Sequence, residues 1–250
     1  MVNMMRCDHG LRPSSADEAK VAVAIARSLG IECVVHRVEI DGSRNVEANA
    51  REARRSVLPE GSLTGHTLDD QAETLLIRLI RGSGSDGLSA ITPGPTHPIL
   101  GLRRHETLAV CSEMGITPVV DPTNDDPSMW RNRIRHEVLP LLNDIAERDV
   151  VPILSRSADV LRQDADFLND LAQTIDPTDA NALCSADPAI ATRALRQWLT
   201  RDGYPPSTAA IQRVLGVARG DAIACEIDGG LRIARSERRL RIITPDTQGE

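Results

Sequence analysis

The hydrophobic positions in the first part of the chain alternate between helical and strand spacing. Apolar residues recur at helical intervals from Ala16 to Leu29, and Gly30 provides a stop. The run "IECVVHRVEI" that follows has the composition of a strand. A second helix is expected from Asn45 to about Leu58, with alanines and a valine on its inner side. This alternation predicts strands joined by helices.

The middle of the chain continues the alternation. After the short "SLTG", a helix is expected from about Leu68 to Arg81, followed by the flexible "GSGSDG". Another helix is expected from Arg103 to Met114, and "ITPVVD" predicts a last parallel strand before the turn "DPTNDDP". The pattern predicts an α/β fold with a Rossmann-like, mostly parallel sheet, whose strand ends would carry a ligand site.

From about Arg131 onward the apolar spacing becomes helical throughout. Helices are expected over 131–146, 151–172 and 189–201, with one more after Pro206, and a pair of short strands around Gly229 and Gly230 closes the chain. We therefore expect two domains, an α/β domain over 1–145 and a smaller, mainly helical domain over 146–250.

Composition and charge limit the classes of function. No apolar run approaches the roughly 20 residues that a membrane span needs, and the opening "MVNMMRCDHG" is too polar for a signal peptide, so we expect a cytoplasmic protein. The five cysteines lie far apart, without a C-x-x-C pair for zinc, redox or sulfur transfer. The formal net charge of -7 disfavours indiscriminate nucleic-acid binding but allows a local basic patch. Lys20 is the only lysine, so arginine supplies nearly all the positive charge.

The stretch "TGHTLDDQAETLLIRLIRGSG", from Thr64 to Gly84, concentrates polar side chains at the start of a helix. Thr67 is expected to be the N-cap and Asp70 its capping-box partner, which leaves His66 unexplained. Asp70 and Glu73 share one helix face, which we expect to point outward. The opposite face should be buried through Ala72, Leu75, Leu76 and Leu79.

Several ordered motifs give the chain a family resemblance. They are "DHGLRP" at 8–13, "NVEANAREARR" at 45–55, the stretch from Thr64, "PILGLRR" at 98–104 and "DPTNDDPSMWRNRIRHEVLPLL" at 121–142. Together they resemble the tRNA(Ile)-lysidine synthase family of PP-loop ATP pyrophosphatases, with an adenine nucleotide alpha hydrolase-like fold. The resemblance implies an enzyme that uses ATP and Mg²⁺, free L-lysine and the CAU-anticodon isoleucine tRNA, and converts a cytidine to lysidine so that decoding changes from Met to Ile. A homodimer is an open possibility.

The resemblance also assigns roles to particular residues. His66, Asp70 and Glu73 would be catalytic, with Asp70 also a metal ligand, and His9 and Arg12 would bind ATP. The tRNA contacts would come from Arg131, Asn132, Arg135, Arg51, Arg55 and Arg81. A hydrogen-bonded turn histidine, a turn-capping arginine and solvated helix faces are the structural alternatives. Trp130 could stack a flipped base, or pack in a core or at an interface.

Two departures from the family pattern keep other functions open. The sequence contains no "SGGxDS" loop, whose backbone amides would hold pyrophosphate, and only "PEGSL" separates "REARRSVL" from "TGH". A noncatalytic tRNA-binding protein is therefore an alternative. A metal-dependent hydrolase built on His66, Asp69 and Asp70 is a third, although no second histidine clusters with them in the sequence.

Overall fold

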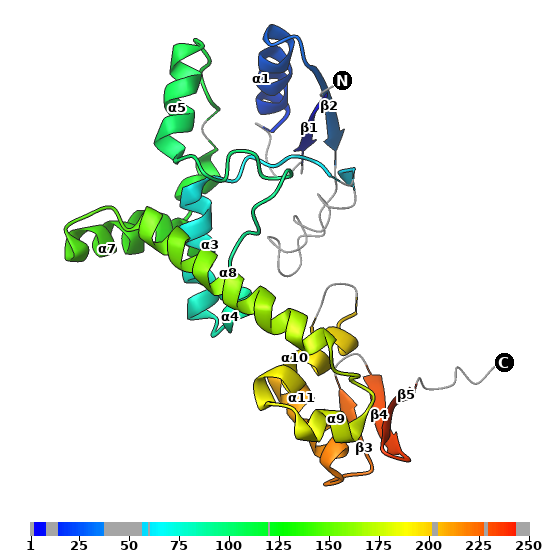
Figure 1. Cartoon of the computed structure of the whole chain (residues 1–250). Helices are drawn as coiled ribbons and strands as arrows, with labels where there is room; N and C mark the ends of the chain where they lie inside the picture. Colours follow the sequence, from blue (N-terminus) through cyan, green and yellow to red (C-terminus); the bar gives the residue numbers. More distant parts are fainter. Residues whose placement is uncertain are drawn as a thin grey trace, which may run out of the picture. The chain divides into compact units, whose positions relative to one another are not determined.

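The fold is that of a computed structural model of the chain (Figure 1). Its described residues are 3–8, 15–37, 57–59, 61–119, 121–201, 205–227 and 230–243. The chain divides into two compact units, residues 1–82 with 90–158 and residues 83–89 with 159–250. No helix in these described ranges is long and apolar enough to cross a membrane.

The first unit begins with a parallel pair of strands. β1 (Asn3–Asp8) pairs along its whole length with β2 (Glu32–Arg37). The connecting helix α1 (Ser15–Ser28) contacts both strands, and three of its alanines are buried: Ala19, Ala22 and Ala26. Figure 1 shows this helix beside the two strands. A parallel pair joined through a helix is the kind of unit that strand–helix alternation predicts, and β1 adds a strand before the first predicted helix.

The wider parallel sheet expected for this unit is not found among the residues described. Neither "SLTG" nor the described part of "ITPVVD", residues 116–119, forms a strand. Pro118 has no N–H for a sheet ladder, and all four of these residues are at least partly exposed. Among the described residues, the prediction of a mostly parallel sheet therefore holds for β1 and β2 alone, and the other regular elements of this unit are helices.

The helices that pack around α3 share one apolar core. Ala72 and Leu76 of α3 pack with Ile134 and Leu139 and with the start of a long helix at Val151. A π-helix, η2, continues α6 into α7, so 130–146 form one helical run, as the sequence predicts. The elements are α3 (Leu68–Ile80), α5 (Arg104–Glu113), the 3-10 helix η1 (Pro122–Asp125), α6 (Trp130–Arg133), η2 (Ile134–Val138), α7 (Leu139–Ala146) and the first part of α8 (Val151–Gln173).

One prediction about the α3 core face is wrong. Leu79 is 54% exposed, although its spacing places it with Leu75 and Leu76. The core reaches only the first turns of α3, so a residue in its last turn stays in solvent. The helix predicted over 45–58 falls almost entirely outside the described residues.

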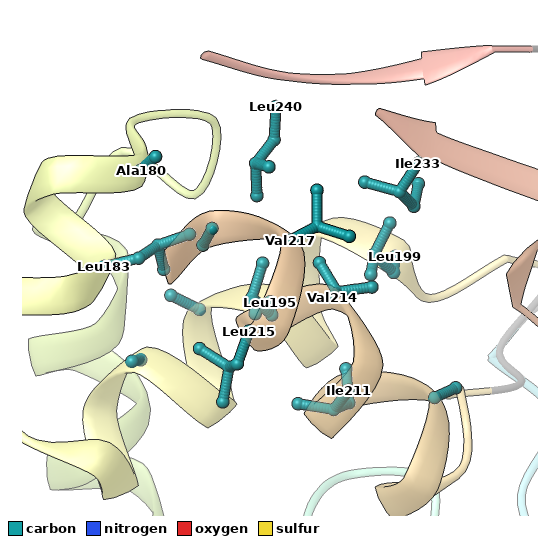
Figure 2. Close-up of a cluster of buried hydrophobic side chains, with 14 of the residues drawn as sticks. Ala180, Leu183, Leu195, Leu199, Ile211, Val214, Leu215, Val217, Ile233 and Leu240 are labelled. Atoms are coloured by element: carbon teal, nitrogen blue, oxygen red, sulfur yellow. The ribbon is translucent and has the colours of Figure 1, made fainter. Parts of the chain in front are cut away.

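The second unit packs helices against a small antiparallel sheet. The strands β3 and β4 form the predicted hairpin, and β5 adds a third strand beside β4. Figure 2 shows Ile233 and Leu240 of the sheet with Leu195 and Val214 of the helices in one cluster. The elements are α4 (Ser85–Leu88), the rest of α8, α9 (Ala180–Ser185), α10 (Pro188–Leu199), α11 (Thr208–Arg219), β3 (Ala224–Ile227), β4 (Leu231–Ser236) and β5 (Arg239–Ile243).

Candidate functional site

The first turn of α3 presents carboxylates at a capped helix start. The backbone N–H and the hydroxyl of Thr67 both donate to Oδ2 of Asp70, each at 2.8 Å. This is the Asp70 half of the predicted capping box, and it fixes the side chain of Asp70 against the helix start. Asp69 and Glu73 flank it on the same helix.

Glu73 is fully buried and is surrounded by arginines. Its Oε1 accepts from Nε of Arg135 at 2.8 Å and from Nη2 of Arg104 at 3.2 Å. Its Oε2 accepts from Nη2 of Arg135 at 3.1 Å and lies 3.6 Å from Nε of Arg131. The prediction that Glu73 points outward is wrong, because the guanidinium groups let a carboxylate be buried with its charge paired.

The two neighbouring aspartates extend the network. Oδ1 of Asp70 lies 3.2 Å from Nη2 of Arg104 and 4.0 Å from Nη2 of Arg135. Asp69 accepts from the guanidinium of Arg103 at 3.1 and 3.2 Å and from the backbone N–H of Arg104 at 2.7 Å. Arg103 also pairs with Asp149. We call the whole set the carboxylate–arginine cluster: Asp69, Asp70, Glu73, Asp149, Arg103, Arg104, Arg131 and Arg135.

Two members of the cluster, Asp69 and Arg135, have pKa values shifted toward their charged forms. Burial raises the pKa of Asp69, but the hydrogen bonds from Arg103 and Arg104 and their charges outweigh it, so this pKa lies below its ordinary value. Burial lowers the pKa of Arg135, while the hydrogen bond and charge of Glu73 raise it above its ordinary value. Asp69 and Arg135 are thus held in their charged forms by partners of opposite charge.

Replacing Asp69 with asparagine should make stability less dependent on pH. Because the folded pKa of Asp69 is depressed, its carboxylate stabilises the fold above its unfolded pKa of about 3.9, and this stability is lost as pH falls through the lower folded value. Urea unfolding should therefore show a stability gap between wild type and Asp69→Asn at neutral pH that narrows below about pH 4. A gap of equal size at both pH values would contradict this assignment.

The loop between α3 and α5 is fastened to α3 along its length. The side-chain amide of Gln71 donates to the carbonyl of Ile91 at 3.0 Å and accepts from the N–H of Ile91 at 2.7 Å. The N–H of Leu68 donates to the carbonyl of Leu102 at 2.8 Å, directly before the two loop arginines. These bonds set Arg103 and Arg104 against the carboxylates of α3.

His66 lies against the same loop. Its Nδ1 is 2.9 Å from the hydroxyl of Thr64, and its ring centroid is 5.1 Å from that of His97. The backbone N–H of Thr64 donates to the carbonyl of Thr96 at 2.8 Å, which holds the segment before α3 to the loop. His66 is thus placed at the helix start beside a second histidine that the sequence pattern does not single out.

Some of the other predicted site residues lie in the described part of the chain, and some lie outside it. The structure brings Arg131 and Arg135 together on Glu73, whereas buried Asn132 donates from Nδ2 to the carbonyls of Thr123 and Asp126 at 2.7 and 3.0 Å and so fixes the preceding turn. Arg81 lies over Trp130. Four more residues predicted to bind ATP or tRNA fall outside the described part of the chain: His9, Arg12, Arg51 and Arg55.

Four cluster members are absent from the site predicted for the ligase: Asp69, a candidate only for the alternative hydrolase, and Arg103, Arg104 and Asp149. A signal for the arginines exists in the sequence. Two adjacent arginines stand at the start of the predicted helix from 103, where the helix dipole disfavours positive charge. Such a pair needs carboxylate partners from elsewhere, and the "TLDDQAE" turn is one of the stretches that offer several together.

The contacts of the Asp70 side chain do not fit the predicted role of magnesium ligand. One oxygen accepts two hydrogen bonds from Thr67, and the other faces Arg104 and Arg135. Mg²⁺ prefers carboxylate and water oxygens, and guanidinium groups beside it would repel the ion. Within the described ranges, no group of three or more His, Cys, Asp or Glu residues could hold a metal ion.

Comparison with known proteins matches both parts of the chain. A PP-loop domain family matches residues 1–142, and a TilS substrate binding domain family matches residues 179–241. The tRNA(Ile)-lysidine synthase of Nocardia farcinica is 37% identical over 99% of this chain and 82% of that protein. Those of Rhodococcus erythropolis and Mycobacterium tuberculosis are each 36% identical, covering 99% and 97% of this chain and 80% of each relative.

Proposed function

The chain belongs to the tRNA(Ile)-lysidine synthase family, and we propose that its carboxylate–arginine cluster is the reaction site of this ATP-dependent ligase. The observation that supports this site is Glu73, a buried carboxylate that gathers Arg104, Arg131 and Arg135 at the start of α3. All three arginines keep part of their side chain exposed. A partly open set of guanidinium groups suits a phosphate-containing substrate.

The reaction has two steps that balance without a redox partner. The C2 carbonyl oxygen of the anticodon wobble cytidine attacks the α-phosphate of ATP, and pyrophosphate leaves. The side-chain amine of lysine, after losing a proton from its ammonium form, then forms a bond to C2 as the C–O bond breaks and AMP leaves. Negative charge moves onto phosphate oxygens in both steps, so positioned guanidinium donors would lower both barriers.

The cluster residues can be given distinct roles. Arg104 and Arg131 are each about one-third exposed, at 33% and 34%, and would donate to phosphate oxygens. Glu73, with no exposed surface, would orient these arginines, and Asp70, whose oxygens face Thr67, Arg104 and Arg135, would help to hold them. His66 would contact nucleotide or base at the same helix start. His9 and Arg12 remain proposed ATP ligands on the segment after β1.

The use of magnesium is proposed from the family resemblance alone. The described residues contain no ligand set for it. Bound with ATP, it would neutralise phosphate charge. No step of the proposed reaction passes through a metal ion at Asp70.

Binding of the isoleucine tRNA is proposed for both parts of the chain. Arg131 and Arg135 belong to the cluster, and Asn132 lies between them in the sequence. We include these three residues in the proposed tRNA contacts, and the basic residues Arg51, Arg55 and Arg81 would contact the phosphate backbone. Residues 146–250 would form the tRNA-binding domain beside a catalytic domain over 1–145, in keeping with the substrate-binding family match over 179–241. We also propose that the protein forms a homodimer, and we assign no surface to the dimer interface.

Incorporation of labelled lysine into isoleucine tRNA tests the function. It should be measured with this chain and with a version extended upstream to include an "SGGxDS" loop. Incorporation that requires ATP is the expected result, and omission of ATP is the control. Failure by the extended version would exclude the ligase. If the extended version is active and this chain binds the tRNA without incorporating lysine, this chain has the noncatalytic binding role.

A further inference from the structure

Trp130 is a large aromatic side chain left in solvent. It is one of only two tryptophans in the chain and is 53% exposed, whereas Trp198 packs against the core of the second unit. The alternative that Trp130 packs in a core is therefore wrong. Exposed tryptophan is uncommon on a surface without a binding role, because its wide ring gains most from being covered.

An arginine lies over the ring of Trp130. The guanidinium carbon of Arg81 is 5.7 Å from the ring centroid, within the range of a cation–π contact. Arg81 is the C-cap of α3, and Trp130 is the first residue of α6, so two packed helices hold the pair in place. The guanidinium occupies one face of the indole, so a base would stack on the other face with this positive charge close by. Unpaired nucleobases stack on such surfaces, and the charge attracts their phosphates.

The distance from Trp130 and Arg81 to the carboxylate–arginine cluster can be spanned by a few nucleotides. Arg131, the next residue after Trp130, reaches Glu73 and donates to the hydroxyl of Thr74 at 3.2 Å. Arg81 follows Glu73 on α3 by eight residues, a rise of about 12 Å along a helix. Stacked nucleotides on one strand are spaced by roughly 3.4 Å, so three or four of them span this distance.

We propose that Trp130 and Arg81 form a stacking platform for an unpaired base of the tRNA, a few nucleotides from the cytidine that reacts at the cluster. The proposal rests on the proposed ligase function for the identity of the RNA. An unpaired base fits better than a duplex, because only an unstacked base exposes a free face to the indole. The platform would thus select a single-stranded loop and hold it in register with the cluster.

Tryptophan fluorescence tests the platform without requiring catalysis. In Trp198→Phe, Trp130 is the only tryptophan, and an RNA hairpin that carries the anticodon loop should quench its emission. A fully paired duplex of the same length should quench much less. The reciprocal variant, Trp130→Phe, should show little quenching with either RNA, because its remaining indole lies in the second core. Equal quenching by hairpin and duplex, or none by a hairpin that binds, would overturn the proposal.

Binding of the same hairpin provides a second measurement. Trp130→Ala should raise its dissociation constant roughly tenfold, the loss expected for one base–aromatic stack, while Trp130→Phe should stay within roughly twofold. A wild-type dissociation constant for Trp130→Ala would also overturn the proposal. Loss of lysine incorporation in every version, with quenching by the hairpin intact, would reject the ligase and still support the platform.

Discussion

Replacing Glu73 with alanine is expected to lower the free energy of unfolding by about 3 kcal/mol and to abolish lysine incorporation. The change removes the carboxylate shared by Arg104, Arg131 and Arg135 and leaves their charges close together in a partly dry site. Removal of one partner from a buried ion pair typically costs about 3–5 kcal/mol, and the partial exposure of the arginines favours the lower end. Activity should fall because the arginines lose their common anchor.

Urea unfolding and the lysine incorporation assay provide the measurements for Glu73. Glu137→Ala is the matched control. Glu137 pairs with Arg133 on the exposed side of the helical run that carries Arg131 and Arg135. That variant should unfold like wild type. Glu73→Gln keeps the volume and an acceptor, so it should recover part of the stability but little of the activity. If Glu73→Ala behaved like Glu137→Ala, Glu73 would not be the centre of the site.

A second large effect is expected from Leu195→Ala in the second unit. Leu195 has no exposed surface and lies within the cluster of Figure 2, beside residues of α11. Truncation of such a leucine removes transfer free energy and leaves a cavity, which together cost about 2–5 kcal/mol. The thermal transition of the second unit should therefore move to lower temperature, and binding of tRNA should weaken at temperatures where this unit unfolds.

Ile223→Ala is the control for that substitution. Ile223 is 84% exposed and precedes β3, so its truncation leaves no buried cavity and should hardly change the transition. Calorimetry of the two variants under identical conditions provides the comparison. Equal shifts for both would indicate that the cluster around Leu195 does not support the unit.

The local features of the site could be predicted from sequence. The N-cap at Thr67 and its partner Asp70 lie three residues apart, and the capping bonds follow from that spacing. The helix beginning at Leu68 and the helical run after Trp130 were predicted from their apolar periodicity, which the structure confirms. These features depend on short-range geometry, which a sequence records directly.

The centre of the site depends on contacts that no local pattern records. Glu73 bonds with Arg104 and Arg135 across 31 and 62 positions of the chain. Glutamate is rarely buried, so a reading of one helix places it in solvent. Glu73 can be buried because arginines from two other segments of the chain pair with its carboxylate. The strand expected in "ITPVVD" fails for a related reason, because strand formation needs a neighbouring strand as well as suitable residues.

The double hydrogen bond between Gln71 and Ile91 has a consequence for ligand binding. It fastens the loop that leads to Arg103 and Arg104 before any ligand arrives. Ordering a free loop around an anion would consume part of the binding free energy as lost conformational entropy. Here the chain has already been ordered during folding, so more of the attraction between guanidinium and phosphate remains available as affinity.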